Sequence, residues 1–325
     1  MEFNNENMII QGRNFKVIDV CNDSITLPDC FAIQCNKYGK GHGEAKLYFG
    51  TKSEMKNFFG VHTECFVLKE DFVKYKNSIQ SAKSVLSTIY KNAISGNTNF
   101  SKILKGIDST INRMQDIESF NIKLMNGLKG SRGYINSINK ATKGGYYYLR
   151  ACCVPFASFI KVLKLQEIST GNFYFYIKLF PDFNEMYQQI LHIQKYGTKS
   201  GLGQKSNRSG QTKYKRELVQ LFHECPFLHI QDERLLVASH IQPFASCNNS
   251  QKYDIENGLL LSPLYDKLFD RGLITFDQQG QLKKTIWVSS AEWSKIPLNY
   301  SIKDLNLTPK RKVYMKFHEK YVFLG

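Results

Sequence analysis

The sequence lacks any long apolar run. No stretch of about 18 apolar residues occurs among its 325 residues, so we expect no helix that spans a membrane. Its first residues, Met-Glu-Phe-Asn-Asn-Glu-Asn, are polar and acidic, whereas a secretory signal begins with basic and then apolar residues. Together these two features predict a cytoplasmic protein.

Closely spaced cysteine pairs are missing as well. The chain has 8 cysteines, and none of them forms a C-x-x-C pair. This spacing argues against a zinc knuckle, whose ligands come in such pairs. In a cytoplasmic protein we expect these thiols to be reduced and mostly buried as small apolar side chains.

Acidic residues are few relative to basic ones. The chain has 44 Lys and Arg but only 28 Asp and Glu, which leaves a net charge of +16. Such an excess favours a polyanionic partner. Nucleic acid is preferred over an anionic membrane because no basic amphipathic helix stands out. A generally basic protein with no polyanionic partner is the alternative.

The first region of the chain, residues 1–192, begins with strand-like patterns and then becomes helical. Short β-prone runs at residues 17–20, 30–34 and 45–49 are separated by turn residues. From Glu70 to Lys129 the apolar residues follow a helical period.

Strand character returns between Lys140 and Phe183. Residues 158–165 and 173–179 are aromatic and β-branched and predict a hairpin. Tyr146-Tyr147-Tyr148 either stacks on bases or sugars, or belongs to the core or an edge strand. We interpret residues 1–192 as a mixed α/β DNA target-recognition domain.

Residues 193–216 form a second region, which is rich in Gly, Ser, Gln and Lys. A basic stretch of such low hydrophobicity cannot build a core, so it predicts a flexible linker. It either contacts a DNA backbone or is a solvated connection between domains. The candidate DNA-binding residues here are Lys205, Arg208, Lys213, Lys215 and Arg216.

The third region, residues 217–325, carries the residues suited to catalysis. A short strand leads into Ser239 and His240, and a polar loop precedes Asn257-Gly258 and a second strand. Pro263 then introduces a helix over about residues 264–270, which Gly272 ends.

That helix places Asp266 and Asp270 one turn apart on the same face, where both can approach one cation. A neutral histidine opposite them can take a proton from water, while a divalent ion binds the scissile phosphate. Oxygen ligands favour Mg²⁺, with Mn²⁺ as a substitute, over zinc. This combination predicts phosphodiester hydrolysis.

Three short sequence words in this region resemble those of the HNH (ββα-metal) nucleases of bacterial restriction enzymes. They are Ala238-Ser239-His240-Ile241-x-Pro243, Asn257-Gly258-Leu259-x-Leu261-Ser262-Pro263 and Asp266-Lys267-Leu268-Phe269-Asp270-Arg271-Gly272. The tail, with Arg311-Lys312-x-Tyr314 and His318, is also similar, so the resemblance runs from about Thr212 to Gly325.

The resemblance implies a role for each motif residue. His240 would be the general base, and Asn257 would shape the loop that orients it or also bind the metal. Asp266 stands where the best-known members have a metal-binding histidine, and Asp270 would be a second ligand on the helix. Arg271 is a candidate phosphate clamp, because a guanidinium can hold two phosphate oxygens.

From this resemblance we predict an α+β protein with a C-terminal ββα-metal nuclease domain behind a DNA-recognition domain. The implied activity is that of a type II restriction endonuclease that cuts double-stranded DNA, acts as a homodimer and is accompanied by a cognate DNA methyltransferase. A modification-dependent nuclease, a phage-defence effector and an inactive DNA-binding protein with a degenerate HNH fold are the alternatives.

Overall fold

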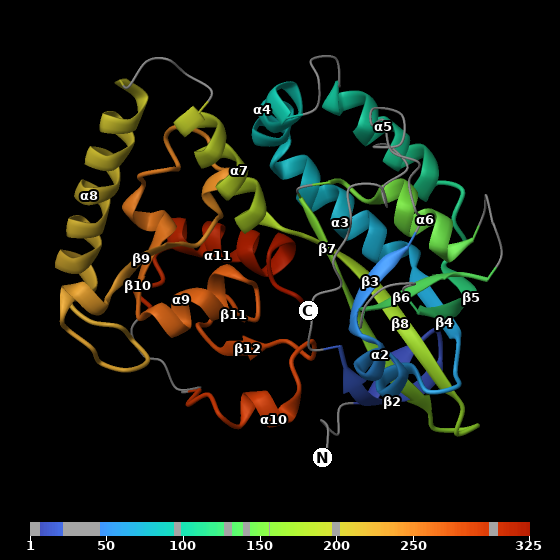
Figure 1. The fold of residues 1–325 in the computed structure, drawn as a ribbon. Coiled ribbons are helices and arrows are strands. Elements are labelled where there is room, and N and C mark those ends of the chain that lie inside the picture. The colour runs from blue at the N-terminus through green and yellow to red at the C-terminus, as the bar shows by residue number, and fades with distance from the viewer. Residues whose placement is uncertain are drawn as a thin grey trace. The chain divides into compact units, whose positions relative to one another are not determined.

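The chain divides into two units, each assembled from three stretches of sequence. The computed structural model describes residues 7–21, 46–93, 99–126, 132–138, 144–155, 157–196, 202–298 and 305–325. The sheet unit comprises Met1–Gln80, Asn99–Asp182 and Ile286–Lys295. The C-terminal unit comprises Ser81–Thr98, Phe183–Thr285 and Ile296–Gly325. Figure 1 labels their elements.

Eight strands of the described residues form one sheet in the sheet unit, in the order β1-β2-β7-β8-β4-β5-β6-β3. Neighbouring strands are antiparallel except β4 and β8, which are parallel. The strands are β1 (Asn7–Ile10), β2 (Arg13–Val20), β3 (Leu47–Thr51), β4 (Glu64–Leu68), β5 (Ile117–Asn126), β6 (Arg132–Ser137), β7 (Ser158–Glu167) and β8 (Phe173–Pro181).

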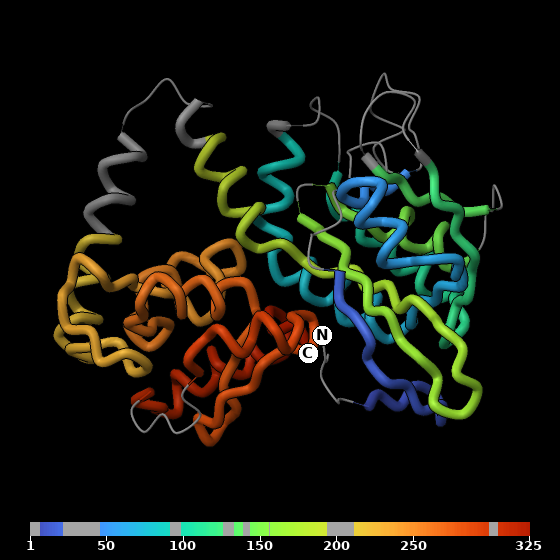
Figure 2. The backbone as a smooth tube through the Cα atoms, turned by 60° about the horizontal axis from the view of Figure 1, so that its bottom comes forward, coloured from blue at the N-terminus to red at the C-terminus, as the bar shows by residue number. Residues whose placement is uncertain are grey.

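The predicted hairpin is present as β7 and β8, which pair antiparallel with Val162 opposite Ile177 (Figure 2). Strand β8 is an almost continuous aromatic and aliphatic run that is buried along most of its length, so both of its faces must be covered. Its one buried cation, Lys178, lies 3.0 Å from the Asp71 carboxylate, because a charge removed from water needs a partner.

Helices of the sheet unit are α2 (Lys52–Phe59), α3 (Lys69–Ser81), α5 (Phe100–Ile111), α6 (Gly145–Cys152) and the short α10 (Ser290–Trp293). Two predictions are corrected here. The helical pattern does not extend to Lys129, because β5 begins at Ile117. The strand character predicted from Lys140 onward does not cover the tyrosine run, which is helical; Tyr146 and Tyr148 are buried side chains of α6, in agreement with the core alternative. The predicted strand at residues 30–34 lies outside the described residues.

Two short antiparallel strands, β9 (Val237–His240) and β10 (Gly258–Leu261), lie at the centre of the C-terminal unit, and helix α9 (Pro263–Asp270) follows them. In this ladder Gly258 is opposite His240. Pro263 occupies the first turn of α9, where its missing N–H costs nothing. The predicted order of strand, loop, strand and helix is therefore present.

Gly272 ends α9 in a left-handed conformation with φ +66. A Cβ at this position would collide with the carbonyl oxygen of Val322, so only glycine fits. The remaining elements of the unit are α4 (Lys83–Ala93), α7 (Phe183–Tyr196), α8 (Leu202–Phe222), β11 (Ile274–Phe276), β12 (Leu282–Lys284), α11 (Pro309–Tyr321) and three short 3₁₀ helices, η1 (Glu233–Leu235), η2 (Phe244–Ser246) and η3 (Ile255–Asn257).

The region predicted as a flexible linker, residues 193–216, is largely helical where it is described. Helix α7 continues to Tyr196 and α8 begins at Leu202. Tyr214 and Leu218 of α8 are buried, and they approach Gly258 so closely that a Cβ there would clash with both side chains. This apolar contact gives α8 a packed face that the overall composition of the segment conceals. No described helix is both long enough and apolar enough to cross a membrane.

Candidate active site

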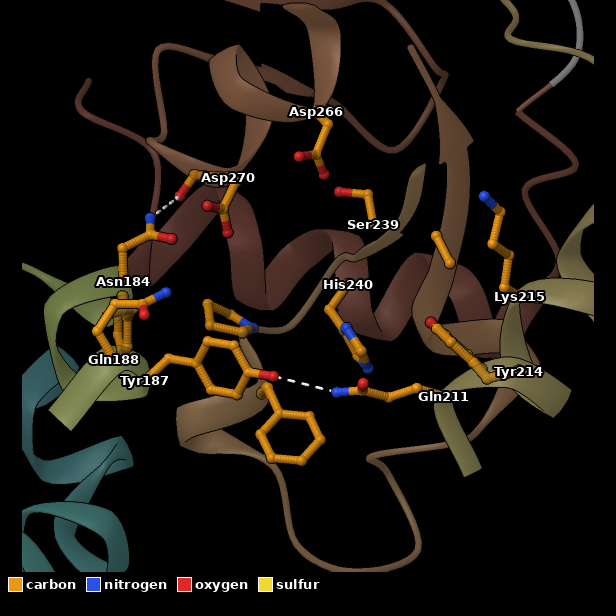
Figure 3. Close-up of a pocket in the computed structure, with 14 residues that line it drawn as sticks. Asn184, Tyr187, Gln188, Gln211, Tyr214, Lys215, Ser239, His240, Asp266 and Asp270 are labelled. Atoms are coloured by element: carbon orange, nitrogen blue, oxygen red, sulfur yellow. Dashed lines mark hydrogen bonds between the residues drawn. The ribbon is translucent and has the colours of Figure 1, made fainter. Parts of the chain in front are cut away.

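A pocket of about 370 Å³ in the C-terminal unit contains three of the predicted catalytic and metal-binding residues, His240, Asp266 and Asp270 (Figure 3). Strand β9 supplies His240, and α9 supplies the two aspartates from the opposite side. Helices α7 and α8 form the other walls. Residues from four separate elements thus meet around one cavity.

His240 is half-buried at the end of β9. Its Nε2 atom lies 2.8 Å from the carbonyl oxygen of Lys252. A carbonyl only accepts hydrogen bonds, so Nε2 carries the proton and the lone pair of the neutral ring is on Nδ1. Burial lowers the pKa of His240, against the opposing effect of this hydrogen bond. The ring is therefore neutral at pH 7, and its Nδ1 can accept a proton.

Two aromatic side chains fix the plane of the His240 ring. Tyr214 stacks on it with ring centroids 4.9 Å apart and an interplanar angle of 19°. Phe244 meets it edge-on, with centroids 5.6 Å apart. The hydroxyl of Tyr214 also donates to the carbonyl oxygen of Asn257 at 2.9 Å. Tyr214 therefore connects the histidine to the start of β10.

Asn257 is 0% exposed, and its amide is used inside the loop that follows β9. Its Oδ1 accepts from the backbone N–H of Gln242 at 2.7 Å. Its Nδ2 donates to the carbonyl oxygen of Gln251 at 3.1 Å and contacts Cys247 Sγ at 3.2 Å. These bonds match the predicted role in shaping the loop. The metal-binding role predicted for Asn257 needs correction, because its oxygen is already engaged and it does not line the pocket.

Asp266 and Asp270 are half-buried on the face of α9 that lines the pocket. Burial raises the pKa of Asp266. Burial, and then the neighbouring charge of Asp266, raise the pKa of Asp270 to about 6. Two carboxylates that destabilise each other's charge are a favourable environment for a cation.

The chemistry of these side chains suits a hard divalent ion. Among the described residues no group of three or more His, Cys, Asp and Glu side chains is arranged to hold a metal. Mg²⁺ does not need one, because it is commonly held by one or two carboxylates, waters and substrate phosphate. The buried Oγ of Ser239 faces the Asp266 carboxylate and lowers the pKa of that group, in opposition to burial (Figure 3). Asp266, Asp270 and Ser239 therefore fit such an ion, with water completing its shell.

The predicted DNA-binding residues fall into three groups. Lys215 lines the pocket and donates to the carbonyl oxygen of Glu233 at 2.8 Å. Lys213 and Arg216 are exposed on α8, and Lys213 lies 3.7 Å from Glu217. Lys205 and Arg208 belong to the part of α8 whose side chains are outside the described residues.

Arg271 ends α9 and is half-buried. Its charge lowers the pKa of Asp270, in opposition to the larger effects of burial and Asp266. The guanidinium is therefore close to the carboxylate pair, as a phosphate clamp would have to be.

Several pocket residues were missed by the sequence reasoning. Helix α7 contributes Asn184, whose Nδ2 donates to the carbonyl oxygen of Asp270 at 3.2 Å, together with Tyr187 and Gln188. Helix α8 contributes Gln211 and Tyr214. A signal for α8 was present: Gln211, Tyr214, Lys215 and Leu218 have the i, i+3, i+4, i+7 spacing of one helix face.

Side chains of the C-terminal helix α11 form hydrogen bonds with the loop between β9 and β10. Arg311 is 0% exposed and donates to the carbonyl oxygens of Asn306 and Ile255. Tyr314 donates to Asp254 at 2.7 Å. Ile255 and Asp254 lie directly before Asn257, so α11 fixes the segment from which β10 starts.

Residues 225–277 match the HNH endonuclease family. The C-terminal unit contains an HNH nuclease domain. The matched segment includes His240, Asn257, Asp266 and Asp270. No curated protein matches the chain. HNH nucleases in general depend on a divalent metal, which agrees with the donor set of this pocket.

Proposed function

We propose that the protein is a Mg²⁺-dependent endonuclease that hydrolyses double-stranded DNA, and that it acts as a site-specific type II restriction enzyme. His240 is the general base, and Asp266 and Asp270 hold the ion. Mn²⁺ substitutes for Mg²⁺ because both accept oxygen ligands.

The observation that carries this proposal is the tautomer of His240. Its Nε2 proton is held by the Lys252 carbonyl at 2.8 Å, so the basic Nδ1 is the atom available to substrate in the pocket. Burial keeps the ring neutral, and stacking on Tyr214 keeps it in one orientation. A base needs these three properties before it can take a proton from water.

The reaction follows from the positions of these groups. Nδ1 of His240 removes a proton from a water molecule, which attacks the scissile phosphorus, and the bond to the 3′-oxygen breaks. A bound divalent ion supplies positive charge for the phosphate oxygens and for the leaving oxygen. Asp266 and Asp270 would hold that ion through their carboxylates, and Arg271 would bind a second phosphate oxygen. The leaving 3′-oxygen takes a proton from solvent, and the imidazolium loses its proton to solvent, which restores the neutral imidazole.

The sheet unit is the candidate for target recognition, because an HNH domain is small and reads little sequence alone. Cutting both strands with one site per chain favours a homodimer, and a cytoplasmic restriction enzyme requires a cognate DNA methyltransferase to protect the host. The net charge of +16 supports a duplex as the partner.

The proposal is tested with purified wild-type and His240→Ala protein and a mixture of methylated and unmethylated plasmid and phage DNA, in Mg²⁺ and in EDTA. We expect discrete fragments from the wild type only, and only with the metal. Discrete fragments from unmethylated DNA support a conventional restriction enzyme, and cleavage of methylated DNA alone indicates a modification-dependent one. Binding without cleavage of any substrate would contradict the nuclease proposal and leave the inactive DNA-binding alternative.

A further inference from the structure

The cavity that contains His240 is larger than its catalytic groups require. Its volume of about 370 Å³ is in the range of pockets that hold a small organic molecule, whereas one phosphate group occupies far less. His240, Asp266 and Asp270 occupy one side, and helices α7 and α8 line the rest (Figure 3). The cavity as a whole therefore has room for more than the scissile phosphate.

The side chains of the second part are amides and an aromatic ring rather than cations. Tyr187 and Gln188 come from α7, and Gln211 comes from α8. Lys215 is the one Lys or Arg among the described lining residues, and its ammonium group donates to a backbone carbonyl. Further phosphates would be bound by Lys and Arg, whereas amides and aromatic rings suit the edges and faces of bases.

Gln211 is held in a definite orientation. Its Nε2 donates to the hydroxyl of Tyr187 at 3.1 Å, a contact that joins α8 to α7 across the pocket. This bond uses one of the two amide N–H groups and leaves the other N–H and the Oε1 acceptor. A donor beside an acceptor is the arrangement with which glutamine pairs with N7 and N6 of adenine. Gln188 presents a second amide from an exposed position on α7.

We propose that this amide surface, formed by Gln188 and Gln211 and oriented by Tyr187, contacts the base edge of the nucleotide next to the scissile phosphate. The inference rests on the proposed nuclease function, because it requires the phosphate to lie between His240 and the two aspartates. Part of the sequence preference for DNA would then come from the C-terminal unit itself. Adenine is the base that this arrangement favours.

The test is to sequence the ends of the fragments that each protein produces from a large genomic DNA in Mg²⁺. The proteins are the wild type, Gln211→Ala, Gln188→Ala and Tyr187→Phe. Gln220→Ala is the matched control, because Gln220 is exposed on the same helix α8 but does not line the pocket. The frequency of each base at the positions beside the cut is compared between proteins.

For the wild type and the control we expect adenine to be enriched beside the cut. Gln211→Ala should reduce that enrichment by roughly fivefold or more, since a bidentate amide contact gives discrimination of this size or larger. Tyr187→Phe should reduce it less, because the amide remains but loses its orienting hydroxyl. Cleavage must continue in these variants, since none removes the base or a carboxylate.

Two negative results have different meanings. If the wild type cuts DNA but the base frequencies beside the cut are the same in Gln211→Ala and Gln188→Ala, the amide contact is refuted and the nuclease proposal stands. If the wild type cuts no DNA under any of the conditions tested, the nuclease proposal itself fails, and this inference fails with it.

Discussion

Two histidines of the C-terminal unit differ at a single atom. In His240 and in His318 the Nε2 proton is donated to a backbone carbonyl, of Lys252 at 2.8 Å and of Phe269 at 3.0 Å. Both rings stack on an aromatic side chain, and burial lowers the pKa of both. At Nδ1 they diverge. His318 accepts from the hydroxyl of Thr275 at 2.8 Å, whereas no described residue donates to His240, whose ring faces the pocket.

The proposed base and the packing histidine differ in the partner of the Nδ1 lone pair. His318 is 1% exposed and has both ring nitrogens satisfied, so it can only stabilise the fold. His240 is kept in the same tautomer by the same kind of bond, but its lone pair is available to water. The resemblance in the sequence covered both residues, whereas the family match over residues 225–277 includes only His240.

The largest expected effect is on catalysis at His240. His240→Ala should reduce the rate of DNA cleavage by roughly 10³-fold, within the range for loss of a general base. The midpoint of thermal unfolding should fall less than in His318→Ala, because the ring of His240 is only half-buried and that of His318 is fully buried. Single-turnover cleavage and thermal unfolding measured on the same preparation check both parts. A large drop in stability with little change in the cleavage rate would contradict the prediction, because His240 would then have the same structural role as His318.

Replacement of either aspartate should come next in size. Asp266→Asn and Asp270→Asn each keep the shape of the side chain but remove a charge that would hold the ion. A bound ion lowers the activation barrier by several kcal/mol, so the rate of cleavage should fall on the order of 10²-fold. Raising the Mg²⁺ concentration should restore part of the rate. Asp277→Asn, in the turn after β11, serves as the control and should cleave normally. Equal activity of all three variants would contradict the assignment of the ion site.

His318→Ala should show the opposite pattern to His240→Ala. Loss of a fully buried ring, its two hydrogen bonds and its stacking on Phe269 should lower the free energy of unfolding by about 3 kcal/mol. Cleavage per folded molecule should be unchanged below the unfolding transition. Denaturant unfolding and an active-site titration provide the two readings. Loss of activity without loss of stability would remove the contrast between the two histidines.

The pH dependence of stability should reveal the buried histidine. Burial lowers the pKa of His318 to about 3 in the folded protein, while its ordinary value is 6.5. Below pH 6.5 the unfolded chain takes up a proton that the folded chain does not, so stability falls by about 1.4 kcal/mol per pH unit as the pH drops toward 3. Urea unfolding at pH 7 and pH 5 should therefore differ by about 2 kcal/mol from this group alone. In His318→Gln this part of the difference should vanish.

Tyr214→Phe should have the smallest effect. The ring that stacks on His240 remains, but the hydroxyl that donates to the Asn257 carbonyl is lost, at a cost of about 1 kcal/mol. We expect kcat to fall by roughly three- to tenfold with KM nearly constant, because this hydroxyl is bonded to the Asn257 carbonyl and would act through the position of His240. Tyr314→Phe, which loses a hydroxyl farther from the base, is the comparison and should have a smaller effect on kcat. A change in KM alone would contradict a positioning role for Tyr214.

Short sequence motifs were sufficient to predict the parts of the site that depend on spacing over a few residues of the chain. Pro263 and Gly272 set the limits of α9, and the spacing of Asp266 and Asp270 placed both carboxylates on one side of it. The hairpin of β7 and β8 was equally readable, because its strands are apolar runs separated by a turn. These features depend on neighbours within a few residues.

What could not be predicted depends on contacts between distant segments. Asn184 precedes Asp270 by 86 positions along the chain, and nothing near it in sequence indicates the hydrogen bond that they share. The alternatives for the tyrosines of α6 did not include a helix, because aromatic residues favour strands. The helix packs against the distant β5, where the ring of Phe120 lies so close to Gly145 that a Cβ there would clash. The basic composition of α8 likewise concealed the face that Tyr214 and Leu218 form.

The division of the chain also constrains how such a protein can evolve or be engineered. Residues Ile286–Lys295 belong to the sheet unit, although segments of the C-terminal unit precede and follow them in the sequence. In the same way, Ser81–Thr98 belong to the C-terminal unit, although segments of the sheet unit flank them. Within the sheet unit, Trp287 packs on Tyr176 and Phe180, so the short segment is part of that core. A single recombination breakpoint therefore cannot exchange the sheet unit for another fold. Each unit is interrupted by a segment of the other, so replacing either one requires several breakpoints.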